Sequence, residues 1–341
     1  MVNIGVIGCG RVANLHLGAY RHIPEANVVA VSDIDLEKAK LFAQNYDISK
    51  VYNNYLDILE MKDLDFVTIC TPTSTHAKIA TEAARFGHNI LLEKPMARTT
   101  VDCDKILQEV AKNRVKLCVC HNQIFIPQVT LAKSIVESEE FDLASFRVSI
   151  KEAATLIGAP SWTITPEEGG ILWESGCHAA YLQLHFLKDA AEVFATGSKI
   201  KHPVYDHFAA LVHTPNHALG IIEVSWLATD PEVLFEYMSS DGKRMQIVNY
   251  NYFSRIPEKL PKSILKGFYF DLKTIIRKWK TTAMDNLRKG KLMRYLPHYI
   301  LVGKYIESLR DDIDPPVKPE DGRKAIKLLE SIESSLEKQS C

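Results

Sequence analysis

The sequence has no long hydrophobic run and almost no net charge. None of its apolar stretches approaches the roughly 18 residues that a membrane span requires. The N-terminus enters a strand pattern without the charged and then apolar pattern of a signal peptide. A formal net charge of −1 gives no general attraction to nucleic acid or to an anionic membrane. Internal repeats and low-complexity segments are also absent. We therefore expect a cytoplasmic protein that is neither membrane-spanning nor a repeat protein.

Cysteine occurs seven times, and we interpret these residues as small buried hydrophobic side chains in a reducing compartment. Cys9 and Cys70 lie in or at the ends of predicted strands, as do Cys118 and Cys120. Together with His121, the last two resemble a metal site. Strand alternation would place both cysteines on one face and His121 on the other, and no second cysteine pair follows at ligand spacing. We expect no metal site.

A length of 341 residues and a hydrophobic content of 46% are enough for two domains, each with its own core. Residues 1–121 alternate between short apolar strands and helical patterns, which predicts an α/β Rossmann domain with a doubly wound parallel sheet. The predicted strands are 3–7, 28–32, 65–70, 89–92 and 116–120, and the predicted helices are 35–46, 77–86 and 100–112.

Residues 122–341 have a different pattern from residues 1–121, because longer predicted strands follow one another with short turns between them. This succession predicts an α+β domain built on a large, mostly antiparallel sheet with one open face. The predicted strands are 144–153, 191–200, 207–213, 218–226, 233–239 and 245–248. A helix over 176–187 interrupts them, and a C-terminal helix is predicted over 320–338.

A glycine-rich turn follows the first predicted strand. It consists of Gly8, Cys9, Gly10, Arg11, Val12 and Ala13. Gly8 permits a tight turn, Gly10 lets the backbone approach a pyrophosphate, and Ala13 allows close packing of helix on strand. The free amides at the start of the following helix favour phosphate. The second strand ends at Asp33, whose carboxylate can bind ribose hydroxyls and would repel a 2′-phosphate. We expect NAD as the cofactor, with NADP as the alternative if neighbouring side chains reshape the pocket.

Lys94 follows the apolar run 89–92, so it should emerge at the carboxyl end of a parallel strand, where open α/β sheets bind ligands. Oxidising an alcohol requires hydride transfer to a nicotinamide and also a base that removes the hydroxyl proton. His178 suits this task, since its unperturbed pKa is about 6.5. Lys94 can donate a hydrogen bond to the same oxygen, or act as the base itself if its pKa is lowered. The sequence leaves open which of the two is the formal base.

The order of the motifs resembles the Gfo/Idh/MocA family of NAD(P)-dependent oxidoreductases over nearly the whole chain. The motifs are the turn Gly8–Ala13, Asp33, Thr71-Pro72-Thr73 with His76, Glu93-Lys94-Pro95, and Gly169-Gly170 followed by Glu174, Gly176 and His178. The resemblance implies that Lys94 is the active-site lysine, that Pro95 follows a cis peptide bond, and that His178 is the catalytic histidine. The implied cofactor contacts are Gly8, Gly10, Arg11, Val12, Asp33, Thr71, Pro72, His76, Glu93 and Lys94. The resemblance also implies that 122–341 binds the substrate and forms a homodimer or homotetramer through its open sheet.

Some positions of the expected substrate site depart from the family pattern. Glu174 stands where related enzymes often carry Asp, and its i, i+4 spacing lets it support His178 in catalysis. Tyr181 replaces a further Asp, which removes a charged acceptor for a cyclic polyol and disfavours plain inositol. Trp162 is a candidate wall for sugar stacking, or else a core aromatic. The expected substrate contacts are Lys94, Asn122, Trp162, Glu174 and His178.

Residues 262–294 are a local exception to the balanced charge. They contain ten Lys or Arg residues and only two acidic ones, and apolar residues recur at helical spacing. We expect a basic amphipathic helical segment over 262–306. It serves as a packing helix with a solvated face, makes a weak contact with an anionic membrane surface, or supplies charge to a phosphorylated or nucleotide-linked substrate.

The sequence thus predicts an NAD-dependent oxidoreductase that acts on a secondary alcohol or ketone of a sugar or sugar derivative. One alternative is an enzyme that uses tightly bound NAD for transient oxidation in a hydrolase or lyase reaction. Others are a non-catalytic NAD-binding sensor or scaffold, and a peripheral membrane module built on the basic segment. We expect no nucleic-acid partner and no transmembrane segment.

Overall fold

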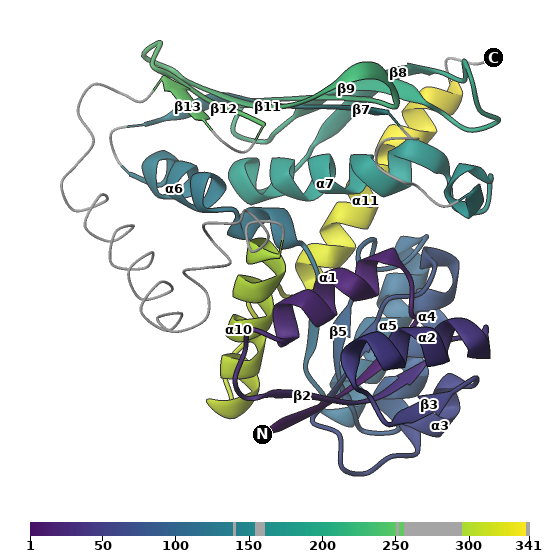
Figure 1. Ribbon diagram of the computed structural model, residues 1–341. Coiled ribbons are helices and arrows are strands. Elements are labelled where there is room, and N and C mark those ends of the chain that lie inside the picture. The colour runs from purple at the N-terminus through teal and green to yellow at the C-terminus, as the bar shows by residue number, and fades with distance from the viewer. Residues whose placement is uncertain (139–140, 154–160, 250–251, 256–294, 339–341) are drawn as a thin grey trace. The chain divides into compact units, whose positions relative to one another are not determined.

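The structure, a computed structural model, describes the chain except for residues 139–140, 154–160, 250–251, 256–294 and 339–341, and except for the side chains of Trp162 and 252–255. The chain divides into two compact units (Figure 1). They comprise Met1–Asn122 with Thr281–Arg323, and Gln123–Lys280 with Lys324–Cys341. The first unit thus includes described residues near the C-terminus that the sequence assigns to the second domain. Most of the predicted basic segment, including all of 262–294, lies outside the described residues.

The first unit contains a six-stranded parallel sheet in the order β3-β2-β1-β4-β5-β6. Its strands are β1 (Val2–Ile7), β2 (Ala26–Ser32), β3 (Lys50–Tyr52), β4 (Phe66–Ile69), β5 (Asn89–Leu92) and β6 (Leu117–Val119). Strands β4, β5 and β6 are apolar and buried almost throughout, as a parallel sheet covered on both faces requires. The strand order reverses at β1, and in such sheets ligands bind at the carboxyl ends of the strands beside that reversal. The predicted doubly wound Rossmann sheet is confirmed.

The helices of this unit include one from far along the chain. They are α1 (Arg11–Tyr20), α2 (Leu36–Tyr46), α3 (Tyr55–Leu59), α4 (Thr73–Arg85), α5 (Thr100–Asn113) and α10 (Leu296–Arg310). α10 packs closely on α1, because a Cβ at Gly18 would lie 2.5 Å from the Tyr295 ring. The Tyr305 hydroxyl lies 3.0 Å from the carbonyl oxygen of Ile90 and 2.9 Å from that of Lys116. These contacts fix α10 to α1 and to the chain beside β5 and β6.

The second unit contains a seven-stranded sheet in the order β13-β12-β11-β7-β10-β9-β8. Its strands are β7 (Leu143–Ala153), β8 (Glu192–Ser198), β9 (His207–His213), β10 (Leu219–Ser225), β11 (Leu227–Ser239), β12 (Arg244–Val248) and β13 (Tyr252–Arg255). Only the β7–β10 pair is parallel, so the predicted, mostly antiparallel sheet is confirmed. The helices α6 (Pro127–Val136) and α7 (Gly170–Leu187) lie on one face of this sheet, and no described element of the unit covers the other face (Figure 1).

Helix α7 is held from two sides within the second unit. Gln183 Nε2 donates to the carbonyl oxygens of Phe146 and Ile221 at 3.1 and 2.9 Å, which anchors α7 to β7 and β10. Trp173 Nε1 donates to Glu333 Oε1 at 3.0 Å and so ties α7 to α11 (Pro319–Lys338). The residues that α7 presents are therefore fixed in position relative to the sheet.

Two helices begin earlier than the sequence pattern predicts. α4 starts at Thr73 rather than 77, because Thr75 Oγ1 donates to the Pro72 carbonyl at 2.7 Å and stabilises the first turn. α7 starts at Gly170 rather than 176. Gly169 and Gly170 have φ values of 77° and 65°, which favour glycine, and a Cβ at Gly170 would lie 2.4 Å from Val204. Most of the motif from Thr71 to His76 is thus helical.

Among the described residues, we find no helix whose length and hydropathy would let it cross a bilayer.

Candidate active site

The turn after β1 has the geometry of a phosphate-binding loop. Gly8 has a φ of 94°, and a Cβ there would lie 2.8 Å from the carbonyl group of Cys70, so the position requires glycine. At Gly10, which precedes α1, no atom lies within 4 Å of the place a Cβ would occupy. A phosphate can therefore approach the backbone at Gly10 and the N–H groups of Arg11 and Val12 in the first turn of α1. These residues fit the pyrophosphate of a dinucleotide.

Asp33 lies directly after β2 and contacts this turn. Its Oδ2 accepts the backbone N–H of Cys9 at 2.9 Å and pairs with Lys38 Nζ at 2.8 Å, while Oδ1 accepts the N–H of Asp35 at 3.1 Å. Burial raises the pKa of Asp33, but the Lys38 contact and the two backbone hydrogen bonds outweigh it, and the pKa is lowered. Asp33 is therefore an ionised carboxylate beside the turn. Its partner Lys38 is not among the residues predicted from the sequence, although both lie in one short segment.

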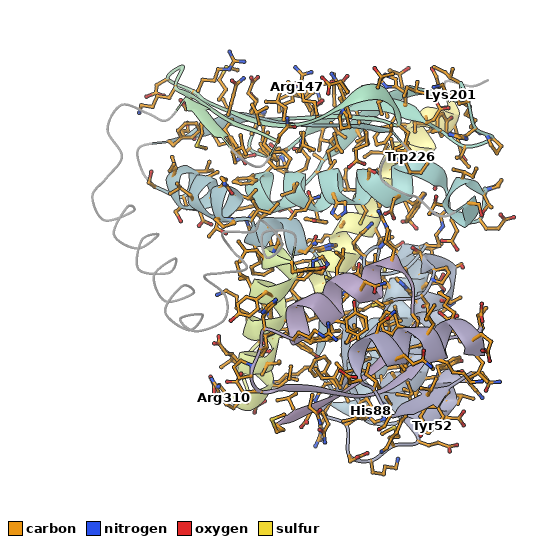
Figure 2. All side chains as sticks on the ribbon, in the orientation of Figure 1. Tyr52, His88, Arg147, Lys201, Trp226 and Arg310 are labelled. Carbon is orange, nitrogen blue, oxygen red and sulfur yellow. The ribbon has the colours of Figure 1, made fainter. Side chains whose placement is uncertain are left out.

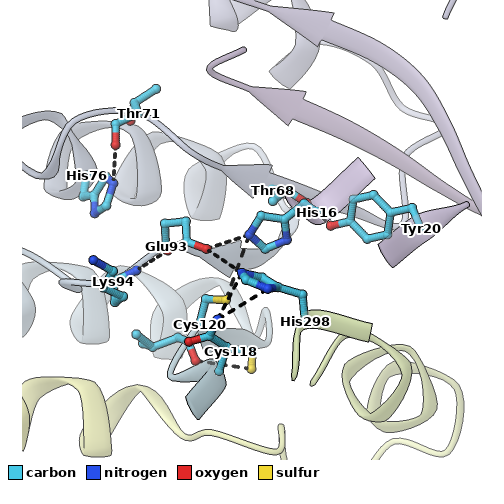
Figure 3. Close-up of polar contacts among 12 residues, drawn as sticks. His16, Tyr20, Thr68, Thr71, His76, Glu93, Lys94, Cys118, Cys120 and His298 are labelled. Atoms are coloured by element: carbon cyan, nitrogen blue, oxygen red, sulfur yellow. Dashed lines mark hydrogen bonds and ion pairs between the residues drawn. The ribbon is translucent and has the colours of Figure 1, made fainter. Parts of the chain in front are cut away.

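The loops that follow β4 and β5 are joined by a buried histidine. His76 Nδ1 lies 2.8 Å from the carbonyl oxygen of Pro95, and Nε2 lies 2.9 Å from that of Thr71 (Figure 3). Pro72 is the residue that precedes α4. The Lys94–Pro95 peptide bond is cis, as the resemblance implies. Four of the expected cofactor residues therefore belong to one connected edge of the parallel sheet.

Lys94 is half-buried and stands two residues after β5, so it emerges at the carboxyl end of that strand as predicted. The preceding residue, Glu93, is buried, and its Oε1 lies 2.7 Å from Nε2 of His16 on α1. Oε2 of Glu93 accepts the backbone N–H of Lys94 at 3.1 Å. Because this side chain is engaged by α1 and by Lys94, a cofactor contact from Glu93 would come from its backbone.

Glu93 belongs to a group of four buried side chains, His16, Glu93, Cys120 and His298, which we call the buried polar cluster (Figure 3). Burial raises the pKa of Glu93, but the hydrogen bond from His16 and the charges of His16, His298 and Lys94 hold it well below its usual value. Burial lowers the pKa of His298 to about 3, with a further contribution from His16. The four residues of the cluster lie far apart in the sequence, at positions 16, 93, 120 and 298, so no local sequence pattern predicts that they come together.

In the second unit, Glu174 and His178 are the only half-buried residues in the first ten of α7. They are four residues apart and so lie on the same face of the helix, as the spacing predicts. All other residues of that stretch are buried. Polar side chains on the accessible strip of a fixed helix are well placed for substrate contact.

His178 is oriented by Tyr181, one turn along α7. His178 Nδ1 lies 2.7 Å from the Tyr181 hydroxyl, which also accepts the backbone N–H of Gln123 at 3.2 Å. Tyr181 is buried. With Nδ1 engaged in this way, Nε2 is the ring nitrogen that can exchange a proton with a substrate. From the sequence, Tyr181 is recognisable only as the loss of an acidic residue, and its contact with His178 is not predicted.

The structure places the remaining candidates in the two units separately. Asn122 Nδ2 lies 3.2 Å from Nε2 of His298, beside the buried polar cluster. The side chain of Trp162 lies outside the described part of the chain. The first unit holds Gly8, Gly10, Arg11, Val12, Asp33, Thr71, Pro72, His76, Glu93, Lys94 and Asn122, and the second unit holds Trp162, Glu174 and His178.

Comparison with protein families gives two matches that follow one another along the chain. Residues 2–121 match a model described as an oxidoreductase family with an NAD-binding Rossmann fold. Residues 129–248 match a model described as the GFO/IDH/MocA C-terminal domain. The two matches correspond to the parallel sheet of the first unit and to the first six strands of the second sheet.

Individual proteins are similar at a lower level. The chain is 29% identical over 202 residues to the uncharacterized oxidoreductase YrbE of Bacillus subtilis, a match that covers 59% of this chain and only 58% of that protein. It is 25% identical over 232 residues to myo-inositol 2-dehydrogenase of Thermotoga maritima, covering 66% and 68% of the two chains. The fold is similar to that of the WlbA dehydrogenase from Bordetella pertussis, solved in complex with NADH and UDP-GlcNAcA, with a TM-score of 0.84, 20% identity, and coverage of 99% and 96%. At 20% identity this likeness concerns the fold alone.

Proposed function

Because the chain belongs to the GFO/IDH/MocA oxidoreductase family, we propose that it is an NAD-dependent dehydrogenase of a sugar or sugar derivative. One observation carries the proposal. The glycine turn, Asp33, Thr71 and Lys94 follow β1, β2, β4 and β5, so all of them lie at the carboxyl edge of one parallel sheet. A dinucleotide site and a lysine at the same edge are what hydride transfer at a carbinol carbon requires.

The residues of the first unit fit a bound dinucleotide. The backbone at Gly10 and the start of α1 would hold the pyrophosphate, and Asp33 would hold the adenosine ribose. When bound, NAD accepts or returns the hydride of the reacting carbon. The negative charge of Asp33 repels a 2′-phosphate, which favours NAD over NADP. The match to an NAD-binding family model supports the same choice.

We propose that Lys94 and His178 handle the proton. Lys94 donates a hydrogen bond to the reacting oxygen and stabilises the negative charge that develops there. The hydroxyl proton passes to His178 Nε2 as the carbon loses its hydride, which leaves a ketone and a protonated imidazole. Glu174, four residues before His178, accepts a hydrogen bond from a substrate hydroxyl. Tyr181 contacts His178 Nδ1 through its hydroxyl, and we assign it the role of a positioning residue.

The substrate is a sugar or sugar derivative with a secondary hydroxyl group, phosphorylated or nucleotide-linked forms included. The named activities of related proteins support this class, since one relative is a myo-inositol 2-dehydrogenase and a structurally similar dehydrogenase was solved with UDP-GlcNAcA. Free inositol is disfavoured for this chain. The Tyr181 hydroxyl is already engaged by His178 and Gln123, so no charged acceptor is available there for a cyclic polyol.

The decisive experiment follows absorbance at 340 nm with NAD and NADP across free sugars, inositols, sugar phosphates and nucleotide-linked sugars. We expect turnover with one substrate class, and its loss in Lys94→Ala. Lys78→Ala, an exposed lysine of α4 in the same unit, is the matched control and should retain full activity. Turnover that survives Lys94→Ala would contradict the assigned role of Lys94. No turnover together with NAD retained through purification would instead favour transient oxidation or a cofactor-binding sensor.

We also propose a homo-oligomer formed through the open face of the second sheet, and a reducing cytoplasmic location. None of the six described cysteines, Cys9, Cys70, Cys103, Cys118, Cys120 and Cys177, forms a disulfide, as is usual in a reducing compartment.

A further inference from the structure

Four side chains with metal-binding atoms converge inside the first unit. They come from α1 (His16), from the residues that follow β5 (Glu93) and β6 (Cys120), and from α10 (His298). All four are buried, and one ligand atom from each lies within 4.8 Å of the others. We propose that this buried polar cluster is a structural Zn²⁺ site, which goes beyond the dehydrogenase activity and replaces the expectation that the chain holds no metal.

The spacing of the atoms is close to that of a tetrahedral site. Zn–N and Zn–S bonds of about 2.0–2.1 and 2.3 Å place neighbouring ligand atoms roughly 3.3–3.6 Å apart. His298 Nε2 lies 3.9 Å from Glu93 Oε1, and Cys120 Sγ lies 4.0 Å from His16 Nε2. The His16–Glu93 contact of 2.7 Å must open, because a metal ion would replace that hydrogen bond. The longer distances, up to 4.8 Å, must shorten towards that range, so the side chains must rotate for the four atoms to surround one ion.

The donor chemistry and the charge both fit zinc. Two imidazoles, one thiolate and one carboxylate form a mixed N, S and O set, which is typical of tetrahedral Zn²⁺ rather than of the oxygen-binding cations Ca²⁺ and Mg²⁺. A Cys120 thiolate and the Glu93 carboxylate together carry two negative charges, which one divalent ion neutralises. This balance matters because all four groups are removed from water, where unpaired charge is costly.

The surroundings of His298 supply a further element of such a site. Asn122 Nδ2 lies 3.4 Å from Nδ1 and 3.2 Å from Nε2 of His298, and Asn122 Oδ1 is buried without a hydrogen-bond partner among the described residues. Turning the amide by half a rotation exchanges its two ends and brings Oδ1 to the ring. Because Asn122 lies slightly nearer to Nε2 than to Nδ1, the His298 ring must also turn. Oδ1 then accepts the Nδ1 proton and leaves Nε2 for the metal, an arrangement common behind metal-binding histidines.

Four protein ligands leave no open coordination position, so the ion is structural rather than catalytic. Its effect would be to tie α10 to α1 and to the carboxyl ends of β5 and β6. Lys94 directly follows one of the ligands, so the ion would also restrain the segment that carries this lysine. The proposal does not depend on which substrate the protein uses.

The first test is the metal content of the full-length protein, produced without a histidine tag and measured by mass spectrometry of the elements. We expect about one zinc per chain. Cys120→Ser and His298→Gln should each weaken binding by at least about 100-fold in competition with a chromogenic chelator, since even residues behind the ligands contribute 10–100-fold. Cys118→Ser and His88→Gln are the matched controls. Both residues are buried in the same unit but are not part of the cluster, so these two substitutions should leave zinc binding unchanged.

A second test covers the case in which a variant fails to fold. Co²⁺ added to the metal-free wild-type protein should give the strong visible bands of a tetrahedral site and a near-ultraviolet band from thiolate to metal. Zinc should also raise the melting temperature of the metal-free protein. Bands of a six-coordinate ion bound by oxygen, or the absence of both bound metal and a thermal shift, would overturn the proposal. Zinc that stays bound in both Cys120→Ser and His298→Gln would overturn it as well.

Discussion

At the scale of single residues, Asp33 and Lys38 act in opposite directions on cofactor choice. Asp33→Asn keeps an acceptor for the Cys9 N–H but removes the charge that repels a 2′-phosphate. We expect the preference for NAD over NADP, as a ratio of kcat/KM values, to fall roughly tenfold, which corresponds to about 1.4 kcal/mol. Lys38→Met removes the cation that pairs with Asp33, so it should raise the preference. If both variants changed the preference for NAD over NADP in the same direction, the result would contradict these opposite roles.

Tyr181 offers a second prediction at this scale. Tyr181→Phe removes the hydroxyl that holds His178 Nδ1 at 2.7 Å. A hydrogen bond contributes about 1 kcal/mol, so we expect kcat to fall roughly fivefold, with the KM for NAD unchanged and an altered pH profile of kcat. Tyr237→Phe is the control, because the buried Tyr237 hydroxyl has no hydrogen-bond partner among the described residues. A pH profile identical to that of the wild type would show that Tyr181 does not act through His178.

Individual residues also show how far the sequence alone reaches. The positions of Gly8 and Lys94 are predictable, because each residue follows a short apolar strand and must therefore lie at the carboxyl end of that strand. His16 and His298 are not, because an isolated histidine on a helix carries no information about which distant side chain it will meet. Cys120 was assigned correctly as buried, but its polar neighbours come from three other elements. Local patterns predict position, whereas partners depend on long-range packing.

At the scale of secondary-structure elements, the contact between α6 and α7 should make the second unit sensitive to acid. Burial lowers the pKa of His185 on α7 to about 3, and Lys133 on α6 adds to the shift. Lys133 also donates to the His185 carbonyl at 2.5 Å and pairs with Glu137 at 3.1 Å. Between an unfolded pKa of about 6.5 and the folded value, the unfolded chain binds a proton that the folded chain does not, so stability falls as the pH falls through this window.

We expect His185→Gln to reduce the loss of stability between about pH 7 and pH 4. Tryptophan fluorescence during urea unfolding can report this, since all four tryptophans of the sequence lie within Gln123–Lys280, which belongs to the second unit. His22→Gln, in the first unit, should leave the pH dependence of that fluorescence signal unchanged. The account fails if His185→Gln and the wild type lose stability in parallel.

Elements differ in how well their sequence patterns predict them. β5 and α5 follow strong local periodicity, and their expected bounds agree with the structure to within one residue. The starts of α4 and α7 depend on hydroxyl and glycine geometry, which periodicity does not capture. The parallel pairing of β7 with β10 inside an otherwise antiparallel sheet is a long-range choice, and no short turn signals it.

At the scale of the whole molecule, chain order and spatial order differ. α10 follows the last strand of the second sheet along the chain but belongs to the first unit. Its contacts through Tyr305 and at Gly18 hold it beside β5 and α1. A boundary drawn along the sequence assumes that each domain is continuous. The predicted division at 121 is such a boundary, whereas the first unit also contains Thr281–Arg323.

The open face of the second sheet carries the last prediction, which concerns assembly. Side chains in register across this face change from apolar to polar in the row Phe194, Leu211, Ile221, Arg147, Glu236 and Gln246. Arg147 of this row is labelled on the sheet in Figure 2. Phe194 and Leu211 remain 55% and 43% exposed, although large apolar side chains paired on a sheet usually mark an interface. Arg147 and Glu223 pair at 3.0 Å and supply a polar region beside them.

A two-fold interface uses the same patch on both copies, so one substitution removes two contacts. Burying a Leu side chain contributes about 1.5–3 kcal/mol, and Leu211→Glu should therefore raise the dissociation constant by at least about 100-fold. We expect light scattering to report a dimer or tetramer for the wild type and a smaller species for Leu211→Glu. Ile313→Glu, which replaces an equally apolar residue that is 58% exposed in the first unit, should leave assembly intact. A wild-type protein that is monomeric in light scattering would contradict the proposed interface, because Phe194 and Leu211 would then be exposed to water rather than buried against a second copy.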